Sequence, residues 1–207
     1  MSILPILNGV VLNKAFTLLE LVIVIVATSI LSVFFIPQFY NNSLLDATMQ
    51  VVRHIKHTQH LALNDARYMH TDKLWYKSMW RISFRSKNCY VVSSNTDYDK
   101  NYDRLESAHD PIDRLLLYSN VECEEEQTDT KWMFLESYYS IDMITFSKAC
   151  GSNRFIAFDH QGRPHKSLKN SHDLLKNKCI ITIYQKENKA EITIRPETGY
   201  TTYKLID

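Results

Sequence analysis

The sequence predicts an α+β fold in which a long N-terminal helix packs against an antiparallel β-sheet head. Between Glu20 and Asp46 the 207-residue chain contains no charged residue, which favours one long apolar helix. Apolar residues then recur every three or four positions, and beyond about residue 72 short β-like runs replace this pattern. A chain of this length suits one globular domain preceded by an anchor.

The uncharged segment predicts a membrane span. Its 25 positions between Glu20 and Asp46 extend over roughly 38 Å as a helix, against about 30 Å for a hydrocarbon core. Lys14 precedes the segment and favours a cytoplasmic N-terminus. The apolar core is too long for a cleavable secretory signal. A plain signal anchor remains an alternative, but it leaves Glu20 unexplained at the edge of the apolar run.

The helical pattern continues after Pro37 with amphipathic chemistry. Polar residues separate the members of one apolar stripe, which comprises Leu45, Met49, Val52, Ile55, Leu63 and Ala66. We expect this half of the helix to lay its stripe against the sheet.

The remainder of the chain predicts strands separated by polar loops. The candidate strands are Trp80–Phe84, Tyr90–Val92, Arg114–Tyr118, Met133–Leu135, Met143–Phe146, Phe155–Phe158, Cys179–Tyr184, Ala190–Ile194 and Tyr200–Leu205. The polar residues 185–189 suit a hairpin connection between two of these runs.

Residues 14–21, with the sequence KAFTLLEL, resemble the processing site of type IV prepilins and type II secretion pseudopilins. In that family a small residue precedes a Phe, and Thr, Leu, a hydrophobic residue, Glu and Leu follow. The resemblance implies that a prepilin peptidase cleaves between Ala15 and Phe16 and N-methylates Phe16, which keeps its positive charge. It also implies that Glu20 neutralises this amine on a neighbouring subunit, and that Pro37 kinks the helix. Pairing of Glu20 with Phe16 of its own chain is the alternative.

The resemblance divides the chain into a leader at 1–15, a transmembrane and assembly half-helix at 16–43, an amphipathic half at 44–70 and an exported β-rich head at 71–207. It implies a minor pilin or pseudopilin of a type IV pilus, a type II secretion system or a competence pseudopilus. Its partners would be other pilins, the peptidase and the bacterial inner membrane, with the head in the periplasm. Two departures are Ala15 in place of the usual Gly and a leader longer and more apolar than usual.

Residues 155–164, with the sequence FIAFDHQGRP, and residues 180–200, with the sequence IITIYQKENKAEITIRPETGY, resemble the C-terminal sheet of minor pseudopilins of the GspH and FimT type. Gly162, Arg163, Pro164 and His165 resemble part of the Gly-Arg-x-Arg element of DNA-binding minor pilins, with His165 in place of the last Arg. Arg163 and His165 are thus candidate DNA-binding residues, and a DNA-uptake pilin is an alternative function. Nearby Lys166, Lys169, Lys176 and Lys178 would add phosphate contacts. The alternative is a surface turn with scattered basic residues. An unrelated single-pass anchored protein is the alternative outside the family.

All four cysteines lie in the proposed head, which suits an oxidising compartment. Of the three pairings that four cysteines allow, we favour Cys89 with Cys123 and Cys150 with Cys179, and free buried thiols remain an alternative.

Motifs for chemistry are sparse. His54, His57 and His60 point in different directions on a helix, and the acidic run 124–126 has no patterned oxygen ligands around it, so we expect neither a metal nor another cofactor. Without a nucleophile elbow, a phosphate loop or a zinc-protease motif, we expect a protein that is not an enzyme.

Overall fold

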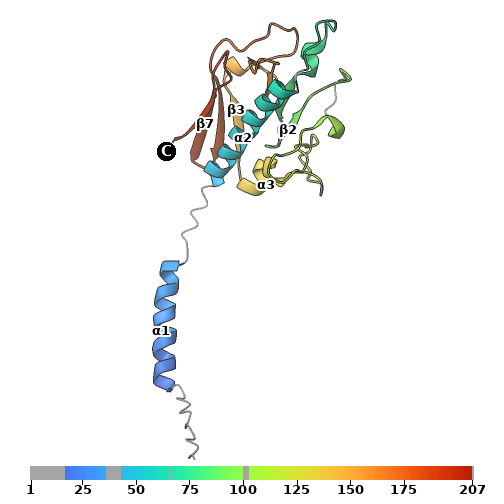
Figure 1. The fold of residues 1–207 in the computed structure, drawn as a ribbon. Coiled ribbons are helices and arrows are strands. Elements are labelled where there is room, and N and C mark those ends of the chain that lie inside the picture. The colour runs from blue at the N-terminus through green and yellow to red at the C-terminus, as the bar shows by residue number, and fades with distance from the viewer. Residues whose placement is uncertain (1–16, 36–42, 66, 100–102, 207) are drawn as a thin grey trace, which may run out of the picture. The chain divides into compact units, whose positions relative to one another are not determined.

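The computed structural model describes residues 17–35, 43–65, 67–99 and 103–206. The chain divides into two compact units, residues 1–40 and residues 41–207. The described part of the first unit contains helix α1 (Leu18–Phe35), and the second contains helix α2 (Ser43–Asn64) with all the strands (Figure 1).

The expected single long N-terminal helix is wrong, and the antiparallel head consists of two sheets. α1 ends at Phe35 and α2 begins at Ser43 as a separate helix. A proline disfavours the α conformation of the residue before it, so that helices usually end at or before that residue. Pro37, two residues beyond Phe35, lies outside the described residues, as does the kink expected there.

The expected single-pass anchor in an inner membrane is also wrong. None of the helices in the described ranges combines the length and the apolar character that crossing a membrane requires. The 18 residues of α1 extend over roughly 27 Å, against about 30 Å for a hydrocarbon core.

The second unit contains two four-stranded antiparallel sheets. The first has the order β2-β1-β4-β5 and the second has the order β3-β6-β7-β8. The strands are β1 (Trp80–Phe84), β2 (Tyr90–Ser93), β3 (Met143–Phe146), β4 (Phe155–Phe158), β5 (Pro164–His165), β6 (Cys179–Gln185), β7 (Asn188–Ile194) and β8 (Thr201–Ile206). A short helix, α3 (Leu135–Tyr139), precedes β3, and four 3₁₀ turns occupy Trp75–Ser78, Arg104–Glu106, Lys131–Met133 and Lys148–Cys150.

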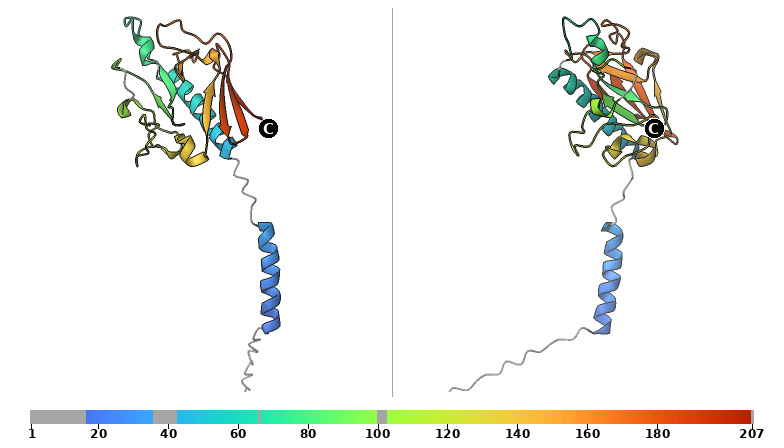
Figure 2. Two further views of the ribbon diagram at one scale, coloured as in Figure 1. Left: turned by 180° about the vertical axis from the view of Figure 1, so that it is seen from behind. Right: turned by 90° about the vertical axis from the view of Figure 1, so that its right-hand side faces the viewer.

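α2 joins the two sheets into one core. It contacts β1 and β4 of the first sheet and β6, β7 and β8 of the second, and the left view of Figure 2 shows it between the two groups of strands. Its buried stripe includes Ala47, Val51 and Ile55, each with no exposed surface. Because this stripe follows the helical period, the amphipathic pattern in the sequence directly positions α2 on the sheets.

The C-terminal hairpin shows why the second sheet forms. In β6 and β7 buried residues alternate with more exposed ones, as the period of two for side chains on a strand requires. The register places Ile181 opposite Ile192 and Ile183 opposite Ala190. All four side chains therefore face the core from neighbouring strands.

Candidate functional site

The first turn of α1 holds Glu20 by three reciprocal hydrogen bonds with Thr17. The backbone N–H of Thr17 donates to Glu20 Oε2 at 2.9 Å, and the Thr17 hydroxyl donates to the same oxygen at 3.0 Å. In return the backbone N–H of Glu20 donates to the Thr17 hydroxyl oxygen at 3.2 Å. This is a capping box, in which a Thr and a Glu three residues apart satisfy the free N–H groups at a helix start. Glu20 thus has a structural role in its own chain.

α1 exposes apolar side chains around its axis. The side chains from Leu18 to Val26, Glu20 apart, are large and apolar, and they are between 45% and 80% exposed. A helix that is apolar on all sides is normally buried, and a large exposed apolar surface marks an interaction site.

The predicted processing residues Ala15 and Phe16 lie outside the described residues, together with the rest of the proposed leader. Their geometry relative to Glu20 therefore stays a prediction.

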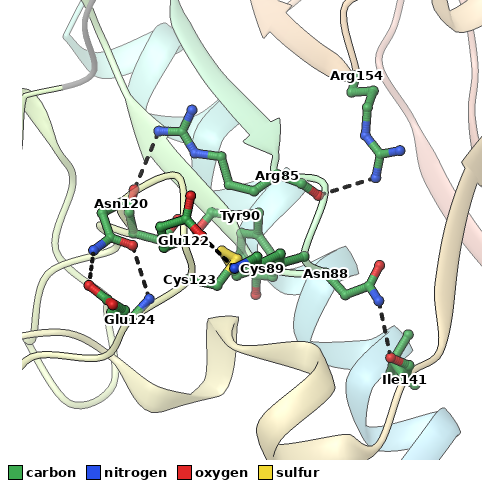
Figure 3. The surroundings of a disulfide bond; sticks show 12 residues. Arg85, Asn88, Cys89, Tyr90, Asn120, Glu122, Cys123, Glu124, Ile141 and Arg154 are labelled. Carbon is green, nitrogen blue, oxygen red and sulfur yellow. Dashed lines mark hydrogen bonds and ion pairs between the residues drawn. A yellow bond between two sulfur atoms is a disulfide. The ribbon is translucent and has the colours of Figure 1, made fainter.

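The four cysteines form two disulfides in the pairing that we favoured, Cys89 with Cys123 and Cys150 with Cys179. Figure 3 shows the first, which ties Cys89, the residue before β2, to Cys123 in an irregular segment. Around it the Asn88 amide donates to the Ile141 carbonyl oxygen at 3.2 Å. The second joins the 3₁₀ turn after β3 to the first residue of β6. Each bond thus anchors a segment outside the sheets, the irregular segment at Cys123 or the 3₁₀ turn at Cys150.

The Gly-Arg turn before β5 is organised by a buried carboxylate that the sequence analysis missed. Asp159 Oδ1 accepts the backbone N–H groups of Gln161 and Arg163, at 3.0 and 2.9 Å. Asp159 Oδ2 accepts Arg163 Nε at 2.8 Å and lies 3.2 Å from Nε2 of the fully buried His165. Burial acts to raise the pKa of Asp159, but hydrogen bonds from His165 and Arg163 outweigh it and hold this pKa well below its usual range. Both candidate DNA-binding side chains thus contact Asp159.

Two of the lysines near the Gly-Arg element in the sequence line an open surface cavity together with Arg195. Lys176, Lys178 and Arg195 border a cavity of about 520 Å³ that also includes Asn177, Pro196 and Thr198. All three cations are exposed, and none forms an ion pair with a residue in the described ranges. The Arg195 guanidinium lies 5.6 Å from the centre of the Tyr200 ring. The cavity therefore offers positive charge beside an aromatic face.

α2 carries a buried polar network around His54. Its Nε2 lies 3.0 Å from Asp110 Oδ2, and its Nδ1 lies 2.7 Å from the Tyr90 hydroxyl. Burial lowers the pKa of His54, outweighing the opposite effect of Asp110. Burial acts to raise the pKa of Asp110, but hydrogen bonds from His54 and from the Ile112 N–H lower it overall. A neutral His54 that donates to Asp110 and accepts from Tyr90 fits both distances.

An open groove runs beside the first half of α2. It has a volume of about 520 Å³ and is lined by Asp46, Met49, Gln50, Arg53, Ile112, Trp132 and Tyr139. The first four occupy one face of α2, because their spacings are three, four and seven residues. Burial, together with the nearby Asp46, raises the pKa of Tyr139 to about 12. Tyr139 is therefore an uncharged donor in this groove at neutral pH.

Three exposed carboxylates, Asp97, Asp99 and Asp103, place oxygens within 4.8 Å of one another. We expected no metal from the sequence, and these three residues were not among its candidate site residues. Exposed acidic groups often lie this close without a bound ion, so the cluster alone assigns no ligand.

Comparisons with protein-family models, with curated proteins and with solved structures found no match.

Proposed function

We propose that the chain is a minor pilin or pseudopilin, a subunit that is processed between Ala15 and Phe16 and then assembles with other pilins into a fibre. The observation that carries the proposal is the sequence from Phe16 to Leu21, in which Glu20 lies in the first turn of the apolar helix α1. α1 supports it, because its exposed apolar surface is of the kind that neighbouring helices bury.

The capping box gives Glu20 a geometry suited to assembly. A carboxylate has about four acceptor positions, and the two bonds from Thr17 use only one of its oxygens. After cleavage the new amine of Phe16 would stand one residue before Thr17. Glu20 would then pair with the corresponding amine of a neighbouring subunit, which compensates both charges and selects one axial register.

Mass spectrometry of the purified chain tests the processing step. Expressed with a prepilin peptidase, the chain is expected to begin at N-methylated Phe16, and without the peptidase it is expected to keep its leader. Ala15→Leu is the matched control, because a bulky residue replaces the small one before the cut, and this variant should remain unprocessed. A leader that persists in the presence of an active peptidase contradicts the proposal.

Incorporation into fibres tests the role of Glu20. Glu20→Gln keeps the size of the side chain but removes its charge, so we expect a processed subunit that no longer enters fibres. Thr17→Val removes the capping hydroxyl and leaves the acid, so it should weaken the first turn but allow incorporation. Equal incorporation of Glu20→Gln and the unchanged chain rejects the assembly role.

DNA binding by the head is a second candidate, favoured by the cavity of Lys176, Lys178 and Arg195. Phosphate contacts of this kind release counterions, so binding should weaken steeply with salt. In a mobility-shift assay Lys178→Glu should abolish the shift, whereas Arg163→Ala should leave most of it, because Asp159 already holds Arg163. A shift that needs Arg163 but not Lys178 assigns DNA binding to the Gly-Arg turn instead of the cavity.

A further inference from the structure

The groove along α2 has a charge pattern that matches a second copy of itself. Asp46 is exposed in the first turn of α2, and it forms no ion pair with any residue that the structure describes. Arg53, seven residues later, has a side chain that is 39% exposed; its guanidinium donates to the Gln50 side-chain oxygen and lies 4.0 Å from Asp110. One face of the helix therefore carries an acid and a base about 10.5 Å apart along the axis.

Two such helices pair best when they run antiparallel. A two-fold axis between Met49 and Gln50 places Asp46 of one copy opposite Arg53 of the other, and the symmetry repeats the contact. An isologous interface requires self-complementarity of this kind, whereas a parallel arrangement in register places like charges together.

The groove also has the apolar lining that such a contact needs. Met49 is 49% exposed and Ile112 is 64% exposed, and both line the groove beside Trp132 and Tyr139. The Met49 side chain projects from one copy, and a flexible thioether adapts readily to an irregular apolar gap. In the antiparallel arrangement it enters the groove of the partner copy while the charged residues align at the ends.

We propose that this groove is the docking surface for a second copy of the chain, paired antiparallel along α2 through Asp46, Met49 and Arg53. The inference does not depend on the proposed processing or on fibre assembly. It uses only residues of the second compact unit, in each of the two copies.

Thiol cross-linking of the full chain tests the geometry. Every cysteine of the chain is in a disulfide, so one introduced residue supplies the reactive thiol. In the antiparallel pair the two positions 49 lie about 1.5 Å apart along the axis, and the two positions 56 lie about 20 Å apart. A disulfide needs Cα atoms within about 7 Å. Met49→Cys should therefore form a covalent dimer under mild oxidation, and the matched control Lys56→Cys should not.

Charge reversal tests the pairing. Asp46→Arg or Arg53→Asp in the Met49→Cys background should each reduce the cross-linking rate about 10- to 30-fold, because both ion pairs become repulsive. An equimolar mixture of the two reversed chains should restore the rate, since each acid then faces a base in the other chain. Circular dichroism and intact disulfides verify the fold of each variant.

Three results overturn the inference: no cross-linking at position 49, equal cross-linking at positions 49 and 56, or a mixture that cross-links no faster than its components. Equal rates at the two positions would indicate a parallel or unspecific association, such as contact through α1.

Discussion

Asp110 attaches the irregular segment that contains it to α2, through His54. Asp110→Ala should lower the free energy of unfolding by about 3 kcal/mol. The side chain has no exposed surface, and it accepts both His54 Nε2 and the backbone N–H of Ile112. Its loss leaves the buried N–H of His54 without an acceptor, which costs about 1–3 kcal/mol, and removes the bond to Ile112, worth about 1 kcal/mol. Arg53 adds little, because its partly exposed side chain is screened by water.

Urea unfolding at pH 7 measures this loss. Asp103→Ala is the matched control, since Asp103 is exposed and makes no capping bond with its side chain. The control should stay within about 0.5 kcal/mol of the unchanged chain. Equal losses in the two variants would refute the reasoning.

The pH dependence of the same variants tests the network independently. The pKa of His54 is lowered in the folded chain, so below about pH 6.5 the unfolded chain binds a proton that the folded chain does not. The free energy of unfolding therefore falls as the pH drops below the pKa that His54 has in the unfolded chain. Asp110 favours the charged His54, so its removal should lower this pKa further and make the loss between about pH 6.5 and 5 steeper. A flatter profile in Asp110→Ala would refute this sign.

Three further changes have expected outcomes. Replacing Cys89 and Cys123 together by Ala should cost about 3–4 kcal/mol in urea unfolding, because the bond closes a loop with a sequence separation of 34. Asp159→Ala should raise the pH midpoint of acid unfolding, because the lowered pKa of Asp159 gives stability that is present above about pH 3.9 and lost as the pH falls. Gly199→Ala should lower the melting temperature, equivalent to about 1–3 kcal/mol, since φ is +65° and the new Cβ would lie 2.5 Å from Gln59 Nε2.

The positions of strands were predictable where polar residues flank a short apolar run on both sides. β1, β3 and β4 have the predicted bounds, and the C-terminal strands differ from theirs by one or two residues. Short apolar runs elsewhere misled the prediction. Arg114–Tyr118 contains only isolated bridges at Leu116, and Met133–Leu135 forms the end of a 3₁₀ turn and the start of α3. Periodicity alone does not separate a short buried strand from a buried helical turn.

The residues around the candidate sites were predictable only where their partners are local in sequence. The Thr-x-x-Glu spacing of Thr17 and Glu20 is the signature of a capping box, so the structural role of Glu20 was available from the pattern. Asp110 lies 56 residues from His54, and no spacing rule connects them. The two-residue strand β5 was missed because it is too short to show alternation.

Glu20 and Asp46 both lie in the first turn of a helix, where the helix dipole favours an acid, but their surroundings differ. Glu20 has Thr17 as a local partner, whereas Asp46 has no ion-pair partner among the described residues. The two acids belong to separate compact units, and changes at independent sites are expected to add. Glu20→Gln should therefore abolish fibre incorporation without changing cross-linking at position 49, and Asp46→Arg should slow that cross-linking without affecting processing at Phe16. If either substitution changes both measurements, the two contacts belong to one interface and must be assigned together.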